Sequence, residues 1–539
     1  MILYGPVTSS VFELLISSVF ALLIVSAVRW IAARTIICKR FPEAPVPRWL
    51  KTYAFVFIGL FALLGRLSLL GVEGVPRPSV VDEISYLFMA DTFTTGRLTN
   101  PPHPLWTHFE PIFILSRPTY ASVYPVAQGL ILAAGKVFIG NYWSGLLLSS
   151  DVMFAAICWM LQSWFPVRWA VLGSLIAVLQ FGLTGYWINS YWGGCHAALG
   201  GALVLGACRR MEFRKKVRDS LILGAGLAIL ANSRPYEGLL LGVAALGLFL
   251  LRTRRFGPLL PAAIVLACSF AGMFYYFSRV TGSPLRMPTQ VYADQYAMVP
   301  IFIWQKLRPE PRYYSKEIGD AMRSPLADYQ RYSSPIGVAR TTVWKILSVE
   351  NFLLGPLVLV SILMLPWLLR SRKPRRLILC CAAVFAAIAA VVPFEIHYGA
   401  PVACAVIALN TECLRRLWIA RRYGNPVGHC LVPAAPVLVC MLTAFSIAKP
   451  LPIPALTDRF TLENQLRAAG GSHLVFVHYG EAHPLSNEWV FNGPRIDSQA
   501  VVWARDQGKL NDELIRYFPE RQVWIIDPDK KPVRAVALR

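Results

Sequence analysis

Apolar runs of about twenty residues recur along this chain from Val11 to Ala448 and are separated by short basic links. A helix of that length spans a hydrocarbon core of roughly 30 Å. The composition agrees, because 55% of the 539 residues are hydrophobic and only 15% are charged. The repeated runs therefore predict a polytopic α-helical membrane protein and exclude a soluble enzyme of ordinary type.

The formal net charge of +23 is concentrated in the links between apolar runs. Lysine and arginine cluster at Arg29–Lys51, Arg209–Arg218, Arg252–Arg255, Arg370–Arg376 and Arg415–Arg422. Basic links of this kind mark the cytoplasmic side of a membrane protein, so we expect no nucleic-acid partner. The eleven cysteines fall mostly inside apolar runs without regular spacing, which predicts small core residues and neither disulfides nor a zinc site.

The basic links also orient the chain across the membrane. We interpret Val11–Ala33 as a retained first span, because the N-terminus lacks the basic region of a signal peptide. A second span at Tyr53–Gly71 returns to the outer face, which makes the loop 72–123 external. The four apolar segments before the next basic link are Tyr124–Gly140, Trp143–Phe165, Trp169–Trp187 and Gly193–Cys208. An odd number of crossings is needed here, so we expect the first or the last of them to be re-entrant or shallow.

Further apolar runs bring the expected total to about 11–13 transmembrane helices. They are Leu221–Ala231, Leu239–Leu251, Pro258–Phe277, Phe352–Leu369, Leu377–Val392, Ala400–Leu417 and Cys430–Ile447. A second external loop, 278–351, interrupts the series. We therefore divide the chain into an extra span with its cytoplasmic link at 1–52, a membrane module at 53–448, and an external domain at 449–539.

The residues after 448 are mostly polar and predict a small α/β domain. Short apolar runs at His473–Val477, Ala500–Trp503 and Gln522–Ile526 are typical of buried strands, and Asn511–Tyr517 is expected to form a helix between them. We find no internal repeat of the kind expected for many transporters.

Two adjacent carboxylates, Asp82 and Glu83, stand near the start of the first external loop. Their apolar flanks favour a raised carboxyl pKa. Aromatic residues follow at helical spacing, which predicts an amphipathic helix on the membrane surface. The pair is consistent either with solvated loop charge or with a catalytic site.

The pattern Asp82-Glu83-x-x-Tyr86, followed by Arg117-Pro118 before the next apolar run, resembles the GT-C membrane glycosyltransferases. The likeness is to the branch that contains the protein O-mannosyltransferases and the aminoarabinose transferase of lipid A. It extends from Tyr53 to Ala448. The resemblance implies a GT-C-like bundle with external loops at the membrane surface.

The resemblance also implies roles for the motif residues. Asp82 is expected to be the general base that activates an acceptor hydroxyl, with Glu83 as its partner. Arg117 occupies the place of a lysine in the aminoarabinose transferase and is expected to bind the phosphate of a lipid-linked donor. The chain departs from that transferase at Ser85, where the relative has an arginine.

Other external residues complete the predicted donor site. Arg234 and Glu237 lie in a turn between two short apolar runs, where they either pair with each other or line a cavity. His397 and Tyr398 open a late span from the outer side, where related transferases have a tyrosine that faces the donor phosphate. The donor-phosphate and substrate candidates are Arg117, Tyr86, Tyr124, Arg234, Glu237, His397 and Tyr398.

A metal site has weaker support. His103, His108 and Glu110 have spacing that suits a divalent cation, but a proline-rich loop with polar tips explains them as well. No DxD motif stands out, so we infer no metal-dependent reaction and no certain cofactor. Asn189–His196 is consistent with a packing turn or with sugar contact. The second loop interleaves arginines such as Arg312 with aromatic residues, which suits either an anionic, sugar-bearing ligand or a membrane-surface lid.

These features and the resemblance predict transfer of a sugar from a polyprenyl-phosphate donor to an acceptor hydroxyl on the external face, by a single inverting displacement. The expected partners are that donor, a lipid, glycan or protein acceptor, and membrane lipids. We expect a bacterial inner-membrane location, with the active site and C-terminal domain on the periplasmic side. A transporter or flippase of lipid-linked saccharides is the alternative, and a scaffold for envelope assembly is a third possibility.

Overall fold

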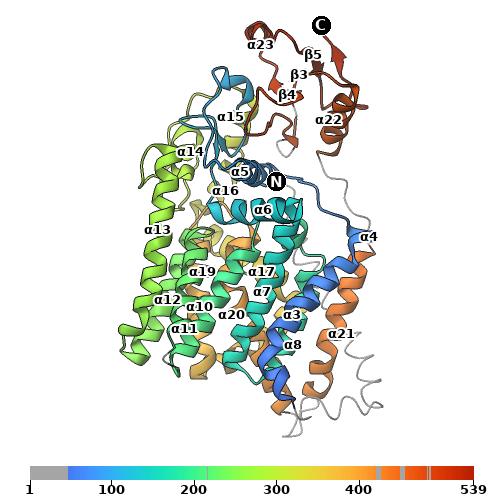
Figure 1. Cartoon of the computed structure of the whole chain (residues 1–539). Helices are drawn as coiled ribbons and strands as arrows, with labels where there is room; N and C mark the ends of the chain where they lie inside the picture. The colour runs from blue at the N-terminus through green and yellow to red at the C-terminus, as the bar shows by residue number, and fades with distance from the viewer. Residues whose placement is uncertain are drawn as a thin grey trace.

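The computed structural model describes residues 46–538 apart from 215, 421–426, 449–455, 482 and 485–486. Most of these residues form helices that run side by side in a bundle, with a small α/β domain beyond one end (Figure 1). The predicted span Val11–Ala33 lies outside the described residues.

Five described helical segments are long and apolar enough to cross a membrane. They are α3 (Arg48–Ser68), α7 (Tyr142–Trp164), α12 (Pro235–Thr253), the segment Gly257–Thr281 that contains α13 (Leu260–Thr281), and the segment Pro335–Leu369 that contains α17 (Pro335–Leu354) and α18 (Val358–Leu369). Other helices fill the bundle between them, namely α8 (Val167–Ala177), α10 (Cys195–Met211), α11 (Val217–Ala231), α19 (Arg372–Ala389), α20 (Ala403–Ala420) and α21 (Val427–Ile447). The protein is therefore an integral membrane protein, as its apolar runs predict.

Helix α3 shows how the sequence pattern builds the bundle. Ala54, Ile58 and Ala62 recur every four residues and are buried on one face of the helix, which packs against α7. Phe57 and Leu64 lie on the opposite side and are exposed. An apolar residue exposed on a membrane-spanning helix contacts lipid, so the helix needs no polar outer face.

Helix α6 (Val126–Ile139) is the shallow segment that the crossing count requires. Its 14 residues span only about 21 Å, which is less than the hydrocarbon core. It begins directly after Pro125, ends at Gly140 in the left-handed conformation, and lies across the end of the bundle beside α5 (Figure 1). The other candidate for the shallow segment, Gly193–Cys208, instead forms α10 within the bundle.

The segment predicted at Trp169–Trp187 is not one continuous helix. Helix α8 passes into a π-helical turn, η2 (Val178–Gly182), and a separate short helix, α9 (Tyr186–Asn189), follows. A π-turn of this kind is frequently found at functional sites, and here it precedes Tyr186.

The second external loop is shorter than predicted. It contains α14 (Pro288–Tyr296), α15 (Lys316–Arg323) and α16 (Leu326–Gln330), but the residues from Pro335 to 351 belong to α17. Ser334 caps α17 by accepting a hydrogen bond from the Gly337 backbone N–H. Polar residues such as Lys345 made α17 look like part of an external loop in the sequence. In the structure Lys345 is buried and donates hydrogen bonds to the carbonyls of Ile388 and Val391, so its charged group does not need solvent.

The first external loop folds onto the end of the bundle. It contains α5 (Val81–Thr94), the short turn η1 (Trp106–Phe109), and a hairpin of β1 (Ile114–Leu115) and β2 (Ala121–Ser122). The strands are antiparallel, with Leu115 opposite Ala121. The hydroxyl of Ser85 lies 2.7 Å from that of Ser122 and donates to the Phe113 carbonyl, which fixes the hairpin against α5.

The C-terminal domain has the predicted strands and helix. Parallel strands β4 (Val501–Arg505), β3 (His473–Val477) and β5 (Gln522–Ile526) lie in that order, and β6 (Val536–Ala537) pairs antiparallel with β5. Helices α22 (Thr457–Ala469) and α23 (Asn511–Tyr517) complete the domain. Its core continues into the first external loop, because Phe88 and Phe109 share one buried cluster with Leu474 and Phe476.

Candidate active site

Helix α5 separates the C-terminal domain from the bundle, and its two faces have different partners. Ile84 and Phe88, four residues apart, pack into clusters that include residues of the C-terminal domain. Tyr86 and Ala90, also four residues apart, pack into the core of the bundle. Asp82 lies one turn before Tyr86, so its carboxylate is presented on the bundle side of the helix.

Glu83 is a structural carboxylate. Its side chain is 1% exposed. One carboxylate oxygen accepts hydrogen bonds from the Ser79 backbone N–H at 2.6 Å, the Ser79 hydroxyl and the Val80 backbone N–H, and the other accepts from the Tyr191 backbone N–H at 2.7 Å. Burial raises the pKa of Glu83, and these hydrogen bonds oppose that rise. The carboxylate closes the first turn of α5 and attaches it to the segment after α9.

Asp82 has a different environment from its neighbour. It is half-buried and accepts a hydrogen bond from the Tyr124 hydroxyl. The ring of Tyr124 stacks on that of Tyr86, with 4.5 Å between ring centroids. Burial raises the pKa of the Asp82 carboxyl, while the Tyr124 hydrogen bond and the nearby charge of Arg234 act in the opposite direction. A carboxylate held in this way is oriented and made more basic, which suits a general base.

Arg234, the residue that precedes α12, lies close enough for its charge to act on this carboxylate. Its guanidinium carbon lies 4.4 Å from the centroid of the Tyr398 ring. Its charge also acts on Tyr86, Tyr186 and Glu237. Among the described residues, Arg234 forms no ion pair within 4.0 Å, so the predicted alternative in which it pairs with Glu237 is not observed. The guanidinium is therefore available to an anion.

His397 and Tyr398 lie in the turn η6 (Ile396–Val402), which packs against α10. This approach needs a glycine, because a Cβ on Gly201 would lie 1.8 Å from the Pro401 carbonyl oxygen. His397 Nδ1 is 3.1 Å from the Tyr186 hydroxyl, and the rings of His397 and Trp192 are in contact. The structure thus brings η6, α9 and the end of α11 together around Arg234.

Several buried polar atoms at this place have no hydrogen-bond partner among the described residues. They include His397 Nε2, His196 Nδ1 and Gln128 Oε1. His196 and Gln128 both lie beside Gly193, and the charges of His196 and His397 interact. Buried polar groups are nearly always satisfied in native proteins, so unpartnered ones next to a free guanidinium indicate a place for a polar ligand or water.

Sequence reasoning missed two residues of this site. Tyr186 lies inside a segment that the sequence predicts to be an apolar span. The only sequence feature that could have indicated a site there is the polar, glycine-containing stretch that follows it. Glu395 precedes η6 and interacts with both Asp82 and Arg234. Burial and the negative charge of Asp82 raise the pKa of Glu395 to about 8. Glu395 is therefore a second carboxyl group close to both Asp82 and Arg234, and its raised pKa reflects its burial and the proximity of Asp82.

Arg117 does not join these residues. It lies in the turn between β1 and β2, and its guanidinium carbon lies 4.1 Å from the centroid of the Trp106 ring. Its carbonyl accepts a hydrogen bond from Gln295, and the neighbouring Thr119 hydroxyl donates to the Val280 carbonyl. These contacts place the Arg117 side chain in a separate external cavity of about 570 Å³. The sequence alone does not predict this separation, because it depends on how the β1–β2 turn orients the Arg117 side chain.

The three metal candidates are also separated. His103 Nε2 lies 3.0 Å from Asp497 of the C-terminal domain, and the Glu110 carboxylate accepts from the Tyr296 hydroxyl at 2.6 Å. His108 lies beside Leu510. In the part of the chain that the structure describes, no three histidine, cysteine or carboxylate side chains are arranged to hold a metal ion. These residues instead attach the loop to its neighbours.

Comparisons with known proteins identify the fold. No family model matches the chain, and no curated protein matches it in sequence. The crystal structure of ArnT from Cupriavidus metallidurans in the apo state is similar, with 14% identity, a TM-score of 0.51, and coverage of 88% of this chain and 92% of that one. ArnT from the same organism bound to undecaprenyl phosphate has 13% identity, a TM-score of 0.52 and the same coverage.

This likeness covers 88% of this chain and 92% of the other. It confirms the bundle that the Asp82-Glu83-x-x-Tyr86 pattern predicts. The chain is therefore an integral membrane protein with the fold of the GT-C glycosyltransferases.

Proposed function

We propose that this protein is a membrane glycosyltransferase that moves a sugar from a polyprenyl-phosphate donor to an acceptor hydroxyl on the external face of the membrane. One observation carries the proposal: the half-buried carboxylate of Asp82, held by the Tyr124 hydroxyl, lies within electrostatic range of Arg234, which forms no ion pair within 4.0 Å among the described residues. The fold of ArnT, a protein whose structure contains undecaprenyl phosphate, supports a polyprenyl phosphate as the donor class.

The donor phosphate binds at Arg234. A guanidinium can hold two phosphate oxygens through parallel hydrogen bonds, and the Tyr398 ring beneath it keeps the group in place. The Tyr398 hydroxyl and the unpartnered His397 Nε2 supply further donors to the phosphate or the sugar. Glu237, in the first turn of α12, is electrostatically coupled to Arg234 and balances its charge before the donor arrives.

The reaction is a single displacement. The acceptor hydroxyl gives its proton to the Asp82 carboxylate as its oxygen forms a bond to the anomeric carbon. The bond between that carbon and the phosphate oxygen breaks, and its electron pair leaves with the polyprenyl phosphate. Attack from the face opposite the leaving group inverts the anomeric configuration. Arg234 stabilises the charge that develops on the leaving phosphate, which is usually the largest catalytic contribution.

Glu83 and Tyr124 act on Asp82 and do not contact the reacting atoms. Glu83 fixes the first turn of α5 through its four hydrogen bonds. The Tyr124 hydroxyl fixes the direction of the Asp82 carboxylate. We place the protein in a bacterial inner membrane, with α5 and the C-terminal domain in the periplasm, and with a lipid, glycan or protein as the acceptor.

The direct test replaces Asp82 with asparagine. Asp82→Asn keeps the shape of the side chain but removes the basic oxygen, so turnover should fall by about 10²–10⁴-fold. Polyprenyl phosphate should still co-purify with the variant, as measured by lipid extraction and mass spectrometry, because Arg234 and Tyr398 remain. In wild-type protein the rate should decline as the pH falls through the raised pKa of Asp82, above the ordinary aspartate range of about 4.

Asp91 provides a matched control on the same helix. It is also half-buried and also accepts a hydrogen bond from a tyrosine, Tyr142, but Arg234 does not act on it. Asp91→Asn should keep most of the activity and the wild-type pH profile. Full activity of Asp82→Asn would remove the base from the mechanism and favour a transporter of lipid-linked saccharides.

A further inference from the structure

A cavity of about 570 Å³ lies among the external loops, apart from Asp82 and Arg234. Its walls come from three stretches of chain that are distant in sequence. The first external loop contributes Trp106 and Arg117, the region of α14 contributes Arg286 and Tyr296, and the segment before α15 contributes Arg312 and Tyr314. The cavity is therefore a tertiary feature that no single motif predicts.

The cavity has an excess of positive charge. Arg286 forms an ion pair with Asp294 at 2.6 Å, and Asp294 also pairs with Arg308, which does not line the cavity. Among the described residues, neither Arg117 nor Arg312 forms an ion pair within 4.0 Å. Two guanidinium groups without an ion pair thus line the cavity from segments that are distant in sequence, and Arg117 lies against the face of an indole ring.

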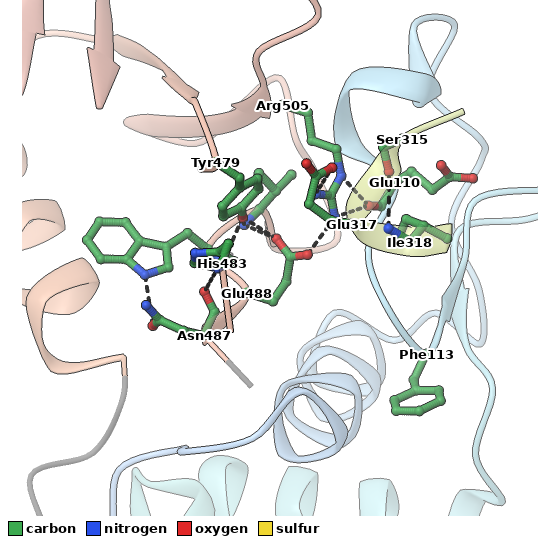
Figure 2. Close-up of polar contacts among 12 residues, drawn as sticks. Glu110, Phe113, Ser315, Glu317, Ile318, Tyr479, His483, Asn487, Glu488 and Arg505 are labelled. Carbon is green, nitrogen blue, oxygen red and sulfur yellow. Dashed lines mark hydrogen bonds and ion pairs between the residues drawn. The ribbon is translucent and has the colours of Figure 1, made fainter. Parts of the chain in front are cut away.

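Buried contacts behind the cavity hold its walls in place (Figure 2). Arg505 of β4 is 2% exposed, pairs with Glu488 at 2.5 Å and with Glu317 of α15 at 3.3 Å, and donates to the Glu110 carbonyl at 3.1 Å. The carboxylate of Glu110 accepts from the Tyr296 hydroxyl, and Tyr296 lines the cavity. The C-terminal domain therefore fixes the first external loop and the start of α15 relative to each other.

The cavity also lies at the membrane surface. Thr281, another of its lining residues, is the last residue of α13. That helix belongs to the 25-residue apolar segment Gly257–Thr281. Only 6% of the most apolar part of this segment is buried inside the protein, so most of its surface faces lipid. A ligand whose tail lies in the bilayer beside α13 can therefore place its headgroup in the cavity.

We propose that this cavity binds the phosphate-bearing sugar of a glycolipid acceptor, a proposal that rests on the glycosyl transfer proposed above. Free guanidinium groups on two walls match the oxygens of a phosphate, which they can bind bidentately. The aromatic side chains Trp106, Tyr296 and Tyr314 supply flat, amphipathic surfaces for the sugar. Arg117 is thereby assigned to the acceptor, in place of the donor role that the sequence predicts for it.

Binding of a simple sugar phosphate tests the proposal. Glucose 1-phosphate, titrated calorimetrically into the full-length protein in nanodiscs, should bind, whereas glucose should bind at least tenfold more weakly. Arg117→Ala and Arg312→Ala should each weaken glucose 1-phosphate binding by about 10- to 100-fold, because each removes a charge-assisted hydrogen bond. Arg308→Ala is the matched control, since Arg308 is an exposed arginine of the same loop outside the cavity, and it should bind as wild type does.

A second titration separates this proposal from the proposed function. Undecaprenyl phosphate binding should be lost in Arg234→Ala and retained in Arg117→Ala and Arg312→Ala. Wild-type binding of glucose 1-phosphate in both cavity variants would overturn the acceptor site while leaving the donor site standing. Equal affinity for inorganic phosphate would show a site for free anions, and equal affinity for glucuronic acid would show a general carboxylate or anion site; either result would overturn the phosphosaccharide proposal.

Discussion

Two arginines, Arg505 and Arg234, are held in polar surroundings on opposite sides of α5, and their surroundings differ. Arg505 has two carboxylate partners and a backbone carbonyl, and Glu488 also accepts from Tyr479 (Figure 2). Arg234 has an aromatic ring, nearby tyrosines and no ion pair within the described residues. The charge of Arg505 is therefore matched by carboxylate partners, whereas that of Arg234 is matched by no ion pair within the described residues.

The difference distinguishes a group that holds the fold from one that waits for a ligand. A buried charge with every partner in place gains little from a further anion, whereas removing any partner is costly. A guanidinium that faces unpartnered polar atoms gains its partners only when a ligand binds. We therefore infer that Arg505 positions the external loops and that Arg234 binds the donor.

The largest expected effect is on stability and follows from substituting Arg505. Arg505→Gln leaves Glu488 buried and unpaired, which should cost about 3–5 kcal/mol of unfolding free energy. Arg234→Gln should leave stability unchanged or raise it, because it removes a charge without stranding a paired carboxylate. Thermal unfolding of the two full-length variants in the same detergent measures the contrast.

Arg505→Lys serves as the conservative variant. A lysine keeps the charge but cannot pair with both carboxylates and the Glu110 carbonyl at once, so it should recover part of the lost stability. Because Arg505 positions the external loops, the Michaelis constant of this variant for acceptor should be raised while its donor binding is normal. Equal destabilisation by Arg505→Gln and Arg234→Gln would remove the distinction between the two clusters.

Much of the fold follows from local patterns in the sequence. Long apolar runs locate the spans because lipid imposes a minimum length on each of them, and short apolar runs locate β3, β4 and β5. The spacing of the aromatic residues after Asp82-Glu83 correctly predicts a helix there, and the pair lies in its first turn. These signals need no knowledge of distant parts of the chain.

The division of roles within the site depends on distant contacts. Nothing near Glu83 indicates that its carboxylate accepts from the Tyr191 backbone, 108 residues away. The resemblance predicts Arg117 at the donor phosphate, but Arg117 lies in the β1–β2 turn and lines the separate cavity. Tyr186 was read as part of an apolar span, because the break after η2 is set by tertiary packing.

The next largest effect concerns the two adjacent carboxylates. Glu83→Gln weakens several charge-assisted hydrogen bonds at the first turn of α5, which should cost about 1.5–3 kcal/mol of stability. Turnover should fall less than in Asp82→Asn, and the acid limb of the pH–rate profile should stay where it is in the wild type. A profile measured over the whole stable pH range, together with thermal unfolding, checks both statements. If the Glu83→Gln protein were stable but inactive, Glu83 would be the general base and Asp82 the positioning residue.

The smallest expected effect concerns Glu395 and the alkaline side of the pH range. The pKa of Glu395 is raised to about 8, so this group is neutral below that pH and becomes negative above it. The new charge lies near Arg234 and repels the donor phosphate, whose own diester charge is constant over this range. Donor affinity in the wild type should therefore fall as the pH rises through about 8, on the order of fivefold for a charge separated by several ångströms of protein. Glu395→Gln cannot acquire the charge, so its donor affinity should stay level between pH 7 and about 9. Titrations of both proteins with a polyprenyl-phosphate-linked sugar, which is a phosphodiester, make the comparison across this range, and parallel curves would show that Glu395 does not face the donor.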